Sequence, residues 1–452
     1  MMRPDLTHEQ LLEHGGGAVD VARALLDVLM RGRTEGLAVC LADGTTLYAD
    51  GGAPRAVIVA RDLGALRALV LGPASVAAAR AVIEGGLDVR GDVEHAIAQV
   101  ERVSDGLHAR DAAKAAAMAL RLPGSAAASR EHRGRHAYRP HGRKHSLARD
   151  RAAIAYHYDV SNEFYELWLD RALVYSCAYF RDGNDSIDQA QLDKLDLICR
   201  KLRLRPDERF LDVGCGWGSL VRFAAKEYGA TAVGVTLSRR QAEYARRRID
   251  AEGLADRCSV ELRDYRELAP LGAFDKAASV GMVEHVGIGM LPGYFRAIHD
   301  ALAPGGMFLN HGITSQRPRP RGLAGFVARV APKRSTFIER YVFPDGDLPR
   351  IDEIASAAEG AGFEVRDVEN LREHYARTLR HWVRRLEANE ARAKAAVGDE
   401  TYNVWRFYMA GSAHGFTAGR MGLGQTLLVK RLPDGSVRVP ATREDVYRRD
   451  AV

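Results

Sequence analysis

A glycine-rich turn between an expected strand and an expected helix is the clearest chemical signal in this chain. The apolar stretch 209–213 contains Asp212, and the turn after it has Gly214, Gly216 and Gly218 at alternate positions. Glycine lets a backbone approach a ligand closely, and the first amides of a helix are free to bind it. The G-x-G-x-G spacing differs from the G-x-G-x-x-G of dinucleotide-binding proteins. The turn therefore predicts a ligand site at the end of this strand.

Glu284, His311 and Cys177 are further residues whose type and place suggest chemistry. Glu284 follows the expected strand 276–280, and His311 ends the expected strand 307–311. Each has a structural interpretation when taken alone, because a glutamate can cap a helix, a histidine can be a paired core residue and a cysteine can be a buried thiol. We expect no nucleophilic role for Cys177. Only a joint pattern with other residues separates these interpretations.

Neither the cysteines nor the histidines predict a metal site. The five cysteines are odd in number and show no C-x-x-C pair, which favours a reducing cytosol and no disulfide framework. Four histidines lie within 130–151, but that stretch has little expected structure to fix ligand geometry. It also holds eight Lys or Arg against two acids, so a flexible basic linker beside anionic lipid or phosphate is the preferred interpretation.

The elements that must position these residues alternate between strand and helix. The expected strands are 209–213, 230–235, 258–262, 276–280, 307–311 and 362–368, with helices at 220–227, 239–252 and 292–302. Strands that alternate with helices predict an α/β fold with a mostly parallel, doubly wound sheet.

A smaller unit precedes this sheet. Its expected strands are 37–41, 46–49, 56–59 and one within 85–91, and its expected helices are 18–30, 63–71, 75–83 and 93–103. It has no plausible nucleophile–base set and no phosphate loop, which favours an accessory or binding domain. We therefore expect a small α/β domain at 1–104, a basic linker at 105–150 and a catalytic domain at 151–452.

Composition limits the compartment and the partners. The chain has 452 residues, of which 46% are hydrophobic and 27% charged, as in globular proteins. No uncharged apolar run approaches the roughly 18 residues of a membrane span, and no signal peptide is evident at the start. The net charge of +6 suggests an anionic partner, either lipid or nucleic acid, without choosing between them.

The glycine-rich turn resembles motif I of class I S-adenosylmethionine-dependent methyltransferases, a Rossmann-like fold. The stretch 303–306, Ala-Pro-Gly-Gly, stands where that fold has its L-x-P-G-G turn. One departure is informative, because the second strand of such enzymes usually ends in an acid that binds the ribose hydroxyls. Here Thr236 follows the expected strand with no acid nearby, so Thr236 and Gln241 would substitute.

Further motifs resemble the cyclopropane fatty acid synthases and the related mycolic acid cyclopropane synthases. They are Y-H-Y-D-V-S-N-E-F-Y at 156–165, Y-S-C-A-Y-F at 175–180, G-V-T-L-S at 234–238, M-V-E-H-V-G at 282–287, H-G-I-T at 311–314, F-I-E-R-Y-V-F-P at 337–344 and H-Y-A-R-T-L at 374–379. The resemblance covers about 150–430 in the family's order and spacing. The N-terminal unit resembles the lipid-binding domain of the members that act on phospholipids.

The resemblance implies roles for two groups of residues. S-adenosylmethionine would be bound by Tyr158, Tyr175, Ser176, Asp212, Gly214, Gly216, Trp217, Gly218, Thr236, Leu237, Ser238, Gln241, Asp264 and Tyr265. The catalytic group would hold a bicarbonate ion and consists of Cys177, Glu284, His311, Ile313 and Tyr375, with Cys177 and Ile313 using backbone groups.

The implied reaction adds a one-carbon unit across the cis double bond of an unsaturated phospholipid acyl chain and forms a cyclopropane. Methyl transfer leaves a carbocation on the chain, and bicarbonate can act as the general base that removes a proton as the ring closes. Tyr158, Tyr175 and Tyr179 are candidates to stabilise the cation. A methylene- or methyl-branched product is the alternative. Nucleic-acid methylation lacks its motif, and a non-enzymatic lipid carrier would not need the catalytic group.

The place of action is expected at a membrane surface. The stretch 315–334 has six Lys or Arg, no acid and several interspersed apolar residues, which is typical of a basic amphipathic segment on anionic lipid. We expect a cytoplasmic protein, peripheral on the inner face of the cytoplasmic membrane. A homodimer would fit the bacterial family members.

Overall fold

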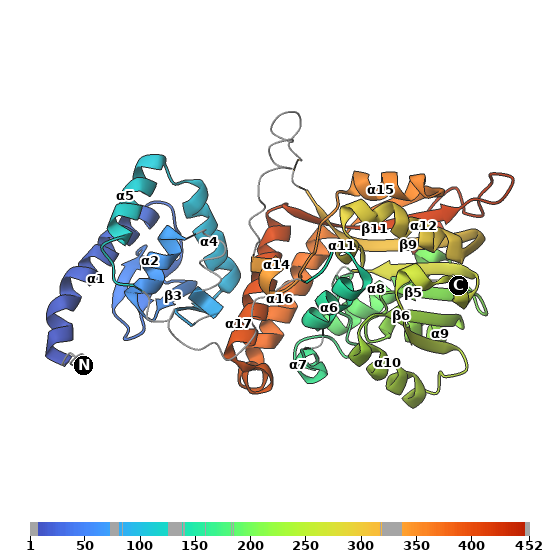
Figure 1. The fold of residues 1–452 in the computed structure, drawn as a ribbon, viewed down its shortest axis with the longest axis horizontal. Helices are drawn as coiled ribbons and strands as arrows, with labels where there is room; N and C mark the ends of the chain where they lie inside the picture. The colour runs from blue at the N-terminus through green and yellow to red at the C-terminus, as the bar shows by residue number, and fades with distance from the viewer. Residues whose placement is uncertain are drawn as a thin grey trace. The chain divides into compact units, whose positions relative to one another are not determined.

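The structure is a computed structural model of the 452-residue chain. It describes residues 8–72, 81–83, 85–124, 138, 141–158, 160–181, 183, 185–316, 318 and 337–447. These residues form two compact units (Figure 1). The first comprises described residues within 1–137, 335–342 and 393–414, and the second comprises those within 138–334, 343–392 and 415–452.

The first unit contains a four-stranded sheet of order β2-β1-β3-β4. The strands are β1 (Leu37–Leu41), β2 (Thr46–Ala49), β3 (Ala56–Ala60) and β4 (Leu87–Gly91), with helices α1 (His8–Met30), α2 (Leu63–Leu71) and α4 (Val93–Asp105). β1 and β3 are parallel, and the other pairs are antiparallel. The expected strands and helices therefore form here, except that the helix expected at 75–83 lies largely outside the described residues.

The range expected to be a linker contains a folded helix. Helix α5 (Ala109–Ala119) buries Ala115 and Ala119. Its Asp111 accepts a hydrogen bond at 2.6 Å from Arg33, which follows the end of α1. Alanines on one face of a helix bury little area each, so this face is a weak signal in a sequence. The first unit also includes 393–414, where Arg406 Nη1 donates to the Val89 carbonyl oxygen at 2.9 Å.

The second unit is built on a seven-stranded sheet of order β10-β11-β9-β8-β5-β6-β7 (Figure 1). The strands are β5 (Arg209–Val213), β6 (Thr231–Thr236), β7 (Cys258–Leu262), β8 (Phe274–Val280), β9 (Leu302–Ser315), β10 (Phe363–Asn370) and β11 (Met421–Lys430). β9, β8, β5, β6 and β7 run parallel, whereas β11 is antiparallel to both β9 and β10. The mostly parallel sheet was expected, but β11 was not. Its burial is nearly continuous, so it lacks the alternation by which a half-exposed strand is recognised.

Helices cover both faces of this sheet, and alternate strand residues face opposite cores. Phe210 packs in the core with α8 (Ile187–Leu202), α9 (Ser219–Tyr228) and α10 (Arg239–Ala251). Leu211, the next residue, packs in the core with α12 (Leu291–Ala301) and α15 (Ile351–Gly360). Side chains alternate along a strand, so Asp212 on β5 and His311 on β9 both fall on the α8 side. Helix α8 therefore underlies both candidate groups.

Gly234 on β6 is required by the close packing of the glycine-rich turn. A Cβ at this position would lie 2.7 Å from Cys215 Sγ and 2.8 Å from Cys215 Cβ. We expect Gly234→Ala to lower the free energy of unfolding by about 1–3 kcal/mol, because the backbone must shift. Gly293→Ala is the control, since a Cβ there meets no atom within 4 Å. Thermal unfolding of the two variants measures the effect, and equal stabilities would contradict this packing.

No helix in the described part of the chain is long and apolar enough to cross a membrane.

Candidate active site

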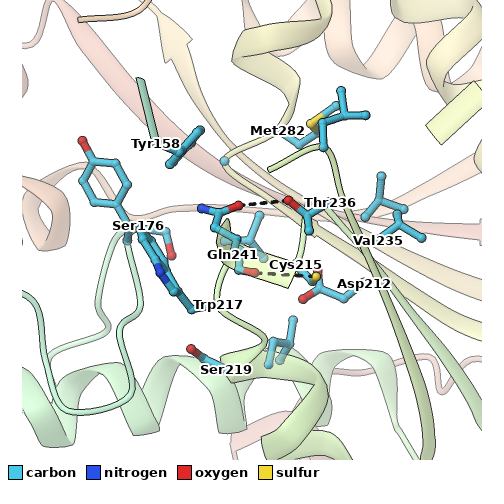
Figure 2. Close-up of a pocket in the computed structure, with 18 of the residues that line it drawn as sticks. Tyr158, Ser176, Asp212, Cys215, Trp217, Ser219, Val235, Thr236, Gln241 and Met282 are labelled. Carbon is cyan, nitrogen blue, oxygen red and sulfur yellow. Dashed lines mark hydrogen bonds between the residues drawn. The ribbon is translucent and has the colours of Figure 1, made fainter. Parts of the chain in front are cut away.

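A cavity lies at the carboxyl ends of β5, β6 and β8 (Figure 2). It is lined by every residue expected to bind S-adenosylmethionine except Gly218 and Ser238. Tyr158 and Trp217 form one wall, and Thr236 and Gln241 lie across from them (Figure 2). Segments far apart in sequence therefore line one cavity.

Gly218 and Ser238 lie outside the cavity lining and shape the helices beside it. Gly218 precedes α9 with φ 78°, and a Cβ there would lie 2.9 Å from Ala245 Cβ. Ser238 is the N-cap of α10, and its Oγ accepts a hydrogen bond from the Gln241 amide at 3.2 Å. These two residues position the site without lining it.

The glycine-rich turn adopts a backbone that glycine favours. Gly214 has φ 82° and Gly216 has φ 54°, both in the left-handed region. The turn leads into α9, whose first amides face the ligand end of the sheet. A tight left-handed turn before a ten-residue helix is a suitable cradle for the methionine part of S-adenosylmethionine.

Thr236 and Gln241 interact directly with each other. The Thr236 hydroxyl donates to Gln241 Oε1 at 2.9 Å, so Gln241 Nε2 remains on the side of Gly216 (Figure 2). Thr236 is the last residue of β6, so the pair lies at the end of the second strand, where the resemblance implies ribose binding. Asp264, which is also expected to bind S-adenosylmethionine, is held by Arg266, whose Nε donates to Asp264 Oδ1 at 2.6 Å.

Lys194 is a cavity residue that the sequence analysis missed. It lies on α8, it is 1% exposed, and its Nζ donates to Ser176 Oγ at 2.9 Å. Burial lowers the pKa of Lys194 to about 8, while burial raises the pKa of Asp212 nearby to about 7. A lysine on the apolar face of a helix is an available sequence signal, because lysine is rarely buried without a partner.

His285 is another cavity residue that was quoted only as part of a motif. Its Nε2 lies 3.4 Å from the Tyr158 hydroxyl, and burial lowers its pKa to about 4. It therefore stays neutral at physiological pH.

The residues expected to hold bicarbonate meet around the β9–β11 strand pair. Glu284 lies on the short helix α11 (Val283–Val286), and its Oε1 accepts a hydrogen bond from the Ile313 amide at 2.7 Å. His311 pairs in register with Gln425 of β11, and its Nδ1 lies 3.1 Å from Gln425 Nε2. Gly312, between His311 and Ile313 in the chain, must be glycine, because a Cβ there would lie 2.2 Å from Val283 Cγ1.

Cys177 and Tyr375 join the same region through Leu371. The Cys177 thiol donates to the Leu371 carbonyl oxygen at 3.7 Å, and the Tyr375 amide donates to that oxygen at 3.1 Å. The Leu371 amide in turn donates to Leu423, which pairs with Ile313 across the two strands. Glu284 contacts Ile313 directly, whereas Cys177 and Tyr375 reach the β9–β11 pair through the Leu371 backbone.

Aromatic rings extend from the cavity to the catalytic group. The ring centroids of Tyr158 and Tyr175 are 6.1 Å apart, and those of Tyr175 and Trp382 are 5.3 Å apart. Trp382 then lies 6.1 Å from Tyr375. Tyr179, the third tyrosine expected to face the cation, stacks on His374 at 4.9 Å. Aromatic faces can stabilise positive charge in the space between the two groups.

Two buried atoms of the catalytic group have no hydrogen-bond partner among the described residues. They are Glu284 Oε2 and His311 Nε2. Burial raises the pKa of Glu284 to about 7 and lowers the pKa of His311 well below its usual range. Burial also raises the pKa of the Cys177 thiol, which fits the expectation that it is no nucleophile. Unpaired buried polar atoms are costly, so a small polar ligand that pairs with either atom would be stabilised.

The raised pKa of Glu284 predicts a pH-dependent stability. Its folded pKa of about 7 exceeds the ordinary 4.5, so the folded state binds more protons in this window. The stabilising contribution is complete below pH 4.5 and is lost as the pH rises through about 7. Since Glu284→Gln is neutral throughout, its stability relative to the parent should increase by on the order of 3 kcal/mol from acid to alkaline pH. Denaturant unfolding at several pH values measures this difference, and a constant difference would refute it.

Comparison with known proteins identifies the family. A family model described as mycolic acid cyclopropane synthetase matches residues 145–426, which is more than half of the chain. The chain belongs to this family. It is an S-adenosylmethionine-dependent methyltransferase of the cyclopropane synthase family, and the expected class I fold and family are both confirmed.

Similar proteins cover different shares of the chain. A probable fatty acid methyltransferase of Pseudomonas putida is 44% identical over 372 residues, which is 81% of this chain and 86% of that protein. Cyclopropane mycolic acid synthase 1 of Mycobacterium tuberculosis is 34% identical over 278 residues, or 61% of this chain and 95% of that protein. Among solved structures, the cyclopropane synthase MmaA2 from Mycobacterium tuberculosis has a TM-score of 0.57 and 32% identity, and covers 62% of this chain and 98% of its own.

Proposed function

We propose that this protein transfers a methylene unit from S-adenosylmethionine to the cis double bond of an unsaturated phospholipid acyl chain, forming a cyclopropane. The observation that carries the proposal is the pair of unpartnered buried atoms, Glu284 Oε2 and His311 Nε2, beside the β9–β11 strand pair. An acceptor and a nitrogen that face no protein partner suit an ion with both oxygen acceptors and a hydroxyl donor. Bicarbonate has that chemistry and, when bound, would supply a general base.

The chain's own residues would then orient the base and exclude water. The Ile313 amide fixes one Glu284 oxygen, which leaves the other to accept a proton from a bound ligand. Tyr175 and Trp382 bring aromatic faces toward the region where positive charge develops on the acyl chain. His311 and Glu284 are buried, at 1% and 8% exposure. Their burial keeps out water, which would otherwise react with the carbocation.

A branched product is the second candidate. The relative that covers 81% of this chain carries the name probable fatty acid methyltransferase, whereas the cyclopropane synthase named above covers 61%. Both products begin with the same methyl transfer, and they differ in which proton is removed from the cation. Loss from the new methyl group closes the ring, while loss from a neighbouring chain carbon leaves a branched alkene.

Membrane association and dimerisation belong to the same proposal. Membrane association rests on the net charge of +6 and on the basic stretch at 315–334, nearly all of which lies outside the described residues, whereas the homodimer rests only on the resemblance to bacterial family members. We propose peripheral binding to anionic lipid on the cytoplasmic face and a homodimer. If the protein co-sediments equally with neutral and anionic vesicles, the proposed binding to anionic lipid is contradicted. A monomeric mass in solution would contradict the homodimer.

The bicarbonate requirement gives the experiment. Purified protein, S-adenosylmethionine with a labelled methyl group and vesicles of unsaturated phospholipid would be mixed in buffer freed of carbon dioxide. We expect transfer of label to lipid to be slow and to be restored by added bicarbonate but not by chloride. A full rate in depleted buffer would contradict the assigned base, and label found only in added free fatty acid would contradict the phospholipid substrate.

A further inference from the structure

A buried lysine and a buried glutamine lie behind His311, on the side opposite its unpartnered nitrogen. Lys201 Nζ donates to Gln425 Oε1 at 2.8 Å, and Gln425 Nε2 lies 3.1 Å from His311 Nδ1. Lys201 and Gln425 are 1% and 0% exposed. We propose that Lys201 and Gln425 are positioning residues that fix the proton of His311 on Nε2, so that His311 presents a hydrogen-bond donor to the anion. This inference deepens the proposed function and rests on it for the identity of the anion.

The orientation of the Gln425 amide follows from the chemistry of lysine. An ammonium group has three donors and no acceptor, so the atom of Gln425 that faces Lys201 must be the oxygen. The amide nitrogen then faces His311, and it can only donate. Lys201 therefore determines which atom of the Gln425 amide is the oxygen and which is the nitrogen.

The same reasoning fixes the tautomer of His311. A nitrogen that accepts a hydrogen bond carries no proton, and a neutral imidazole carries one proton in total. Because Gln425 donates to Nδ1, the proton lies on Nε2. Burial and the positive charges of Lys194 and Lys201 disfavour the doubly protonated form. His311 is thus a neutral donor whose N–H points away from Gln425.

Helix α8 and the sheet edge hold Lys201 in place. Lys201 lies two helical turns from Lys194, so the same face of α8 supports both halves of the site. Its ammonium group forms an ion pair with Glu369, and Asp367 lies 3.9 Å away. These carboxylates on β10 retain the charge of Lys201, although burial lowers its pKa. A charged lysine keeps the Gln425 oxygen turned toward it.

The donor at Nε2 complements the acceptor at Glu284. Glu284 Oε2 and His311 Nε2 are the buried unpartnered atoms of the catalytic group, within the part of the chain that the structure describes. With Nε2 protonated, Glu284 Oε2 can accept a hydrogen bond and His311 Nε2 can donate one. A bicarbonate ion offers a matching group to each, because it has a hydroxyl and two charged oxygens. The opposite tautomer would face the anion with a lone pair and repel it.

Nitrogen NMR of protein labelled in its histidines tests the inference directly. We expect His311 in the parent enzyme to show an unprotonated Nδ1 and a protonated Nε2, assigned by loss of the signal in His311→Phe. In Gln425→Glu, one carboxylate oxygen still accepts from Lys201, while the other can only accept from Nδ1, so Nδ1 should gain a proton. Gln99→Glu, the same change at a buried site in the first unit, should leave His311 unaltered. A protonated Nδ1 in the parent, or no change in Gln425→Glu, would overturn the inference.

A bicarbonate titration separates this inference from the proposed function. Gln425→Glu should raise the bicarbonate concentration for half-maximal activity by at least about 10-fold, with little change in affinity for S-adenosylmethionine. The predicted tautomer in an enzyme indifferent to bicarbonate would support the positioning role and refute the assigned base. Bicarbonate dependence together with a protonated Nδ1 would support the assigned base and refute the positioning role. If Gln425→Glu does not fold, the tautomer of the parent still decides the inference.

Discussion

Glu284→Gln is expected to reduce the rate of product formation by at least about 10²-fold while leaving the affinity for S-adenosylmethionine unchanged. The glutamine oxygen can still accept from the Ile313 amide, so the fold is preserved. The other atom changes from an unpaired oxygen into an amide nitrogen, which can only donate. A proton acceptor for the bound anion is thereby lost. Turnover with unsaturated phospholipid vesicles and calorimetry of cofactor binding measure the two effects separately.

The control for this variant is Glu359→Gln on the exposed side of α15. It makes the same chemical change at an exposed residue and should keep the parent rate. If Glu284→Gln kept most of the parent activity, Glu284 would be a structural cap of the Ile313 amide and the assigned catalytic group would be wrong.

Lys194→Met is expected to weaken S-adenosylmethionine binding by about 10-fold to 100-fold. Lys194 donates to Ser176 Oγ, which leaves the Ser176 hydroxyl hydrogen available to a ligand carboxylate. Its buried positive charge also lies on the wall that contains Asp212 and Gly214. Methionine keeps the length and apolar stem but removes the charge, so the packing of α8 is retained. Calorimetry with S-adenosylhomocysteine measures the loss without turnover.

Lys226→Met is the matched control, since its side chain is 67% exposed on α9. It should bind the cofactor product as the parent does. Unchanged affinity in a folded Lys194→Met protein would show that Lys194 serves only the packing of Ser176 and Asp212.

Local patterns predicted most of the fold, and most of the residues expected to bind S-adenosylmethionine line one cavity. The strands at β1, β2, β5 and β7 have the bounds expected from apolar runs and turn residues. The cavity residues lie in short motifs at strand ends, where the chain order alone places them together. Gly218 and Ser238 are exceptions, because a glycine or serine in a motif can serve the helix cap instead of the ligand.

What the sequence did not reveal depends on contacts between distant residues. Lys194 and Lys201 are both buried on α8, and although their place on its apolar face is a signal, their partners Ser176 and Gln425 lie elsewhere in the chain. Gln425 gains its role from pairing with His311 across β9 and β11, more than a hundred residues apart in the chain. The antiparallel β11 itself has no local signal that separates it from any buried apolar run. The supporting residues of the site are thus the ones that needed the structure.

The most direct test of the central claim is mass spectrometry of the fatty acids recovered after incubation with S-adenosylmethionine, bicarbonate and vesicles of unsaturated phospholipid. We predict the gain of one CH2 unit in the acyl chain, with a cyclopropane ring at the former double bond. A gain of one CH2 as a branched alkene would contradict ring formation and favour the branched-chain function. No gain in any acyl chain would contradict the assignment of a phospholipid substrate.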